Sequence, residues 1–82
     1  MTRSDALAYY LTLTALQRAL VTQLTLLREN LRIMVRLGAP AAARRLMASE
    51  IQRVSLEQMD IRIEIRELAD SQNFPLPPAL RD

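Results

Sequence analysis

Few residues of this 82-residue chain could do acid–base, nucleophilic or metal chemistry. Cysteine and histidine are both absent, which removes disulfides, thiolate ligands and imidazole catalysis. Asp60 and Glu64 stand one helical turn apart and could share a cation, but carboxylates at this spacing are typical of a solvated helix face. The chain has no glycine-rich loop for phosphate. The sequence therefore predicts a protein that is not an enzyme and that binds no metal or cofactor.

The residues best suited to binding are arginines around a predicted bend. Six arginines and only two glutamates lie between residues 28 and 53. A helix start normally carries a polar cap and an acidic first turn, yet Ala39 is the predicted cap here, and Arg44 and Arg45 follow three alanines. With Arg36, these arginines predict a site for an anion such as a phosphate, a carboxylate cluster or an acidic protein surface. The alternative is that they only keep an alanine-rich turn in solution.

An antiparallel helical hairpin would position these arginines. Gly38 is the only glycine and suits the left-handed end of a helix, and Pro40 suits the first turn of the next one. We predict an all-α fold with helices over about residues 4–37 and 40–72 and a bend at 38–39. Thr2 or Ser4 would cap the first helix.

Both predicted helices carry an apolar seam in steps of three and four residues, as antiparallel coiled coils do. The first seam comprises Tyr10, Leu13, Gln17, Leu20, Leu24, Leu27, Leu31 and Met34, and the second comprises Met47, Ile51, Val54, Gln58, Ile61, Ile65 and Leu68. Folding at the bend pairs residues whose numbers add to 78, such as Leu24 with Val54. Gln17 and Gln58 fall in adjacent layers, where they either bond to each other or turn out to solvent.

One flank of the hairpin is predicted to need a partner. The residues of this apolar flank that we assign to partner binding are Val21, Val35, Leu56, Met59 and Ile63. Two helices alone cannot cover this much apolar side chain, and monomers rarely expose large contiguous apolar patches. A homodimer forming a four-helix bundle is the simplest cover, and a helix of a different protein is the alternative.

The hairpin domain (1–73) is predicted to be followed by a proline-rich tail (74–82). Pro75, Pro77 and Pro78 exclude a continued α-helix, so an extended or polyproline-like tail is expected. Phe74-Pro-Leu-Pro-Pro78 satisfies a loose pattern that some proline-recognition domains bind. We favour the alternative that the tail packs on the end of the bundle through Phe74 and Leu76, or is disordered.

The composition favours a cytoplasmic protein-binding module. Residues 7–27 are long and apolar enough to suggest a membrane span, but Arg18 lies near their middle, so no span is predicted. All eleven basic residues are arginine, which is typical of GC-rich bacterial or phage genomes. We expect a small adaptor, regulator, inhibitor or chaperone that binds another protein, such as one with an acidic surface. The alternative is nucleic acid or an anionic membrane surface bound through the arginine-rich bend, against which stands a net charge of only +2.

Overall fold

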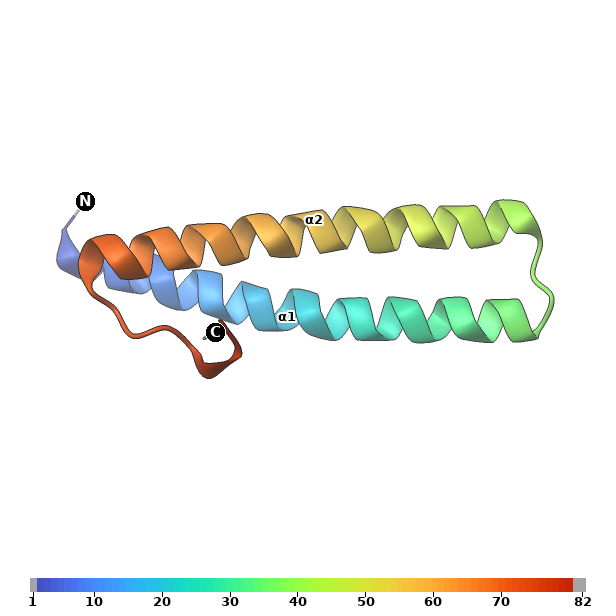
Figure 1. The fold of residues 1–82 in the computed structure, drawn as a ribbon, viewed down its shortest axis with the longest axis horizontal. Coiled ribbons are helices and arrows are strands. Elements are labelled where there is room, and N and C mark those ends of the chain that lie inside the picture. The colour runs from blue at the N-terminus through green and yellow to red at the C-terminus, as the bar shows by residue number, and fades with distance from the viewer. Residues whose placement is uncertain (1, 81–82) are drawn as a thin grey trace.

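Two long helices account for most of residues 2–80, which are the residues that the structure describes (Figure 1). In this computed structural model, α1 spans Arg3–Arg36 and α2 spans Ala41–Gln72. The helices run antiparallel and pack against each other along a rod of 52 × 22 × 17 Å. No strand occurs among the described residues. The predicted all-α hairpin is therefore confirmed.

The helix ends follow from local chemistry. Thr2 caps α1 in a reciprocal capping box, since its hydroxyl accepts from the Asp5 N–H at 3.1 Å and its own N–H donates to the Asp5 carboxylate at 3.4 Å. At the bend, Gly38 takes a left-handed φ of +72°, which lets the Ala39 N–H donate back to the Met34 carbonyl at 2.9 Å. Pro40, rather than the predicted Ala39, is the residue that caps α2.

Asn73 ends α2 in the same left-handed region, at φ +58°. This conformation carries the Phe74 N–H to the Ala69 carbonyl at 2.9 Å and turns the chain back toward the hairpin.

The core lies between the two seams in two clusters. One, at the open end, comprises Tyr10, Leu13, Ile65, Ala69 and Leu80, and the other comprises Leu20, Leu24 and Val54. Leu13 shares a cluster with Ile65, and Leu24 shares one with Val54, as the pairing sum of 78 requires. Between Leu24 and Val54 the described chain has no buried residue, and even seam residues there are only half-buried. The hairpin is therefore thinly packed from Leu24 and Val54 to the bend.

The tail folds back onto α1 instead of extending away (Figure 1). Its last described residues, Pro78–Leu80, form a short 3₁₀ turn (η1), so the tail is not extended throughout. Leu80 is 2% exposed, and its carbonyl accepts from the Arg66 guanidinium at 3.1 Å. The Tyr10 hydroxyl donates to the Pro75 carbonyl. The expectation for residues 81 and 82 lies outside the described residues.

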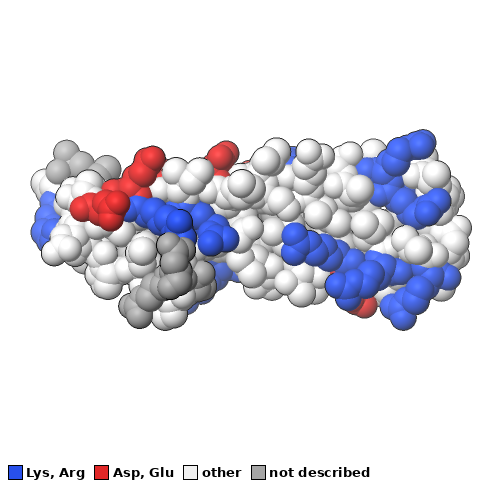
Figure 2. Space-filling model, in the orientation of Figure 1, with Lys and Arg blue, Asp and Glu red and all other residues white. Residues whose placement is uncertain are grey.

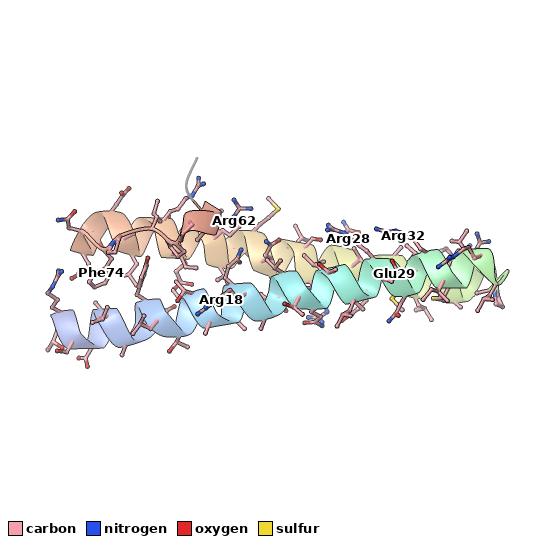
Figure 3. All side chains as sticks on the ribbon, turned by 90° about the horizontal axis from the view of Figure 1, so that it is seen from below. Arg18, Arg28, Glu29, Arg32, Arg62 and Phe74 are labelled. Atoms are coloured by element: carbon pink, nitrogen blue, oxygen red, sulfur yellow. The ribbon has the colours of Figure 1, made fainter. Side chains whose placement is uncertain are left out.

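Phe74 anchors the start of the tail at the open end (Figure 3). Its ring lies 5.1 Å from that of Tyr10, centroid to centroid, and the Arg3 guanidinium carbon lies 4.9 Å from the Phe74 centroid. Arg3 also donates to the Gln72 carbonyl at 2.7 Å. These contacts tie the first turn of α1 to the end of α2, and they use the aromatic residue that a proline-recognition domain would need.

Neither α1 nor α2, as described, is long and apolar enough to cross a membrane.

Candidate partner-binding surface

The five residues assigned to the apolar flank are all exposed but do not form one patch. Val21 and Val35 lie on α1, with 43% and 55% of their surface exposed. Leu56, Met59 and Ile63 lie on α2, each 54–55% exposed. Steps of three and four residues place these last three side by side on one face of α2. We call them the α2 patch.

A shallow hollow lies in the α2 patch. It encloses about 200 Å³ and is lined by Met59, Arg62, Ile63 and Arg66. Its residues stand in the i, i+3, i+4 and i+7 relation, which is the four-residue hole that receives a side chain when helices pack knobs into holes. Met59 and Ile63 of the α2 patch thus line a hollow with the residue spacing of such a hole.

The structure brings Val35 together with the arginines of the bend. A hollow of about 390 Å³, which we call the bend groove, is lined by Leu31, Val35, Ala41, Arg44, Arg45 and Ala48. On its other side, Val35 adjoins a second hollow that includes Arg36. The predicted basic bend and one end of the predicted apolar flank are thus parts of one surface, which Figure 2 shows as blue side chains gathered toward the bend.

The bend arginines differ in their ion pairs. Glu29 lies 3.0 Å from Arg32 and 3.8 Å from Arg36, so Arg36 is partly neutralised. Arg44 and Arg45 have no carboxylate partner within residues 2–80. Arg28, which lies on the same side of the molecule as Arg32, has none there either (Figure 3). The bend therefore keeps unneutralised positive charge beside exposed apolar side chains.

The start of α2 adds to this positive character. Pro40 offers no side-chain cap, and the first turn of α2 contains no acidic residue. The first N–H groups of an uncapped helix point outward and carry partial positive charge. This arrangement can receive carboxylates, which is the chemistry expected from the sequence.

Another flank of α2, which we call the acidic flank, carries Glu50, Glu57 and Glu64, whose carboxylates are paired within the hairpin. Arg53 bridges Glu50 and Glu57, at 2.7 Å from the Glu57 carboxylate, and its hydrogen bond lowers the pKa of Glu50. The Tyr9 hydroxyl donates to Glu64, and this hydrogen bond raises the pKa of Tyr9 above its ordinary value of 10.0. Glu64 is thus engaged with Tyr9, and the described residues contain no group of three side chains that could hold a metal ion.

A cleft of about 550 Å³ separates the folded-back tail from α1. Gln17 lines it beside Arg18, Leu76 and Leu80. Gln17 is 6% exposed, so the expectation that it turns out to solvent is wrong. Its Oε1 has no hydrogen-bond partner among the described residues, so this atom does not accept from Gln58. The α1 seam carries one unsatisfied polar atom.

Sequence reasoning missed several residues that shape these surfaces. Leu80 contributes to the open-end core although three prolines precede it, and no periodic signal marks it. Ala6 and Ala69 are buried next to the seams, where small side chains allow the tail and helices to approach. Arg62 and Arg66 complete the hollow in the α2 patch, and their spacing from Met59 could have identified them.

No family model, no curated protein and no solved structure matches this chain, so its geometry alone carries the argument for function.

Proposed function

We propose that this chain is a non-enzymatic protein–protein interaction module whose hairpin pairs with a second hairpin. The observation that carries the proposal is the α2 patch, in which three large apolar side chains are more than half exposed and two of them, Met59 and Ile63, line a four-residue hollow. Burial of apolar surface by a partner is favourable by about 25 cal/mol of free energy for each Å² removed from water. A second copy is the partner always present with the chain, and it brings the assembly to four helices.

The thin packing near the bend supports the same proposal. A chain of this size has little core to spare, and the stretch between Leu24 and Val54 contributes no buried residue to it. Association supplies the missing burial, because a partner that binds only the folded hairpin stabilises it. Small adaptors, regulators, inhibitors and chaperones of bacteria and phages work in this way, by binding and without catalysis.

The bend groove is the surface we assign to a different protein. Val35 offers an exposed apolar contact, and Arg44 lies beside it without a carboxylate partner in the described chain. A helix with one apolar face and acidic neighbours would complement both features.

Paired charge substitutions test self-association. Leu56→Glu with Ile63→Glu places two charges in the α2 patch, and we expect sedimentation velocity to change from dimer to monomer with a lower melting temperature. The matched control is Leu26→Glu with Ile33→Glu, which are equally spaced, also exposed, and on α1. The control should remain dimeric. A patch variant that stays dimeric and as stable as wild type would refute the proposal.

The alternative function is binding of nucleic acid or an anionic membrane surface through the arginine-rich bend. Arg28, Arg44 and Arg45 favour it because they lack carboxylate partners within residues 2–80. Tyr9 is the exposed aromatic residue, but it lies on the acidic flank, bonded to Glu64, and cannot stack on bases at the bend. Phosphate binding falls steeply with salt, whereas a contact through the α2 patch survives it. Titration with duplex DNA and with anionic vesicles across salt concentrations separates the two functions.

A further inference from the structure

The face of α2 that includes the α2 patch continues as a second heptad stripe along the helix. Steps of four and three residues connect its members, which we call the outer stripe: Arg45, Ser49, Gln52, Leu56, Met59, Ile63, Arg66 and Asp70. All are exposed except Arg66, which is half-buried. The seam toward α1 uses other residues, so the outer stripe faces away from α1 along about 37 Å, and within it Arg66 donates to the Leu80 carbonyl of the tail.

The outer stripe is complementary to itself when reversed. Its residue numbers pair with one constant sum, 115: Arg45 with Asp70, Ser49 with Arg66, Gln52 with Ile63, and Leu56 with Met59. Apolar residues meet at the centre, a small residue faces a long one, and opposite charges meet at both ends. A parallel arrangement would place Arg45 against Arg45 and Asp70 against Asp70 instead.

We infer that two copies of this chain pair through the outer stripe, antiparallel and about a two-fold axis, with Arg45 of each copy opposite Asp70 of the other. This inference rests on the proposed self-association and adds its surface, direction and register. In this register Gln52 of the second copy falls over the hollow lined by Met59, Arg62, Ile63 and Arg66. The side-chain carbonyl of Gln52 can there accept from an arginine at the rim of the hollow.

The charges at the two ends are available for this pairing. Within residues 2–80, neither Arg45 nor Asp70 makes an ion pair or a side-chain hydrogen bond with another residue. Because the pair is two-fold symmetric, the Arg45–Asp70 contact occurs twice, once at each end. The same charges oppose the parallel dimer and a shifted register, because those would leave them unpaired or facing like charges.

A charge swap tests the register. Arg45→Glu and Asp70→Arg should each raise the dimer dissociation constant by about tenfold, because both ion pairs become repulsive contacts. The double variant should return to within about threefold of wild type, because its pairs are re-formed with reversed sign. Neither change threatens folding, since an acid near the start of α2 and a base near its end both suit the helix dipole. A double variant weaker than either single variant would overturn the inference.

Cysteine cross-linking tests the same register without altering any charge. The chain has no native cysteine, so only the introduced cysteines can react. Gln52→Cys combined with Ile63→Cys should give a covalent dimer under mild oxidation. The two positions are about 16 Å apart within one helix, so they cannot react inside one chain. Each single variant should stay uncross-linked, because its cysteine lies about 16 Å from its symmetry mate. Ready cross-linking of the single variants, or no cross-linking of the double variant, would refute the register. If the chain were still dimeric in that case, the proposed function would stand.

Discussion

Replacing Gln17 by leucine should stabilise the hairpin. Gln17 is 6% exposed, and its Oε1 accepts no hydrogen bond within residues 2–80. Leaving a buried acceptor unsatisfied costs about 1–3 kcal/mol, and leucine removes the acceptor while keeping a side chain of similar volume. We therefore expect Gln17→Leu to raise the free energy of unfolding by about 2 kcal/mol. For a domain of this size the melting temperature should rise by roughly 10 °C.

Urea denaturation at one fixed protein concentration measures this change, because dimerisation makes the apparent stability depend on concentration. Sedimentation must first show that Gln17→Leu has the same oligomeric state as wild type. Gln58→Leu is the control, since Gln58 is only half-buried and should change stability by less than about 1 kcal/mol. If Gln17→Leu destabilises the chain by more than about 1 kcal/mol, Gln17 is bonded in solution and the reasoning is refuted.

Three further predictions concern the tail, the bend and the acidic flank. Leu80→Ala should destabilise by about 2–4 kcal/mol in chemical denaturation, because Leu80 is buried in the open-end core; a change under about 0.5 kcal/mol would mean that the tail is undocked. Gly38→Ala should cost about 1 kcal/mol from its left-handed φ alone, since no atom lies within 4 Å of an added Cβ, and Gly38→Asn should cost less; equal stability of all three chains would contradict this. Glu64→Gln should lower the pKa of Tyr9 toward 10.0 in a spectrophotometric titration, because the hydrogen bond to the carboxylate favours the protonated phenol; an unchanged pKa would show that the bond is absent.

The hairpin could be predicted because its signals are local and periodic. The capping residues Thr2 and Asp5, the left-handed Gly38 and the steps of three and four along both seams each fix one feature of the two helices. The helices begin and end within one residue of the expected positions. The position of Gly38 places the bend, and the position of the bend determines which seam residues of the two helices face each other.

The packing of the tail through Phe74 and Leu76 agrees with the prediction. The docking of Leu80 and the burial of Gln17 could not be predicted, because both depend on contacts between distant parts of the chain. Leu80 reaches the core only after Asn73 and the prolines have turned the tail back, and no pattern in residues 74–82 encodes that direction. Gln17 is buried partly because the tail lies over its side of α1, so its burial follows from the tail. Helical spacing also grouped Val21 and Val35 with the residues of the α2 patch. Such spacing assigns a residue to a flank of the hairpin, but it does not show which arginines lie between the apolar residues of that flank.

We propose that this hairpin pairs with a second copy of itself, and the sedimentation equilibrium of the unmodified chain measures that pairing. We expect a mass twice that of one chain at micromolar and higher concentrations, with dissociation to single chains on dilution, in moderate and in high salt alike. High salt should weaken the dimer only modestly, because apolar contacts hold its centre and exposed ion pairs lie at its ends. A single-chain mass at every concentration, with an unchanged melting temperature, would show that the hairpin does not self-associate.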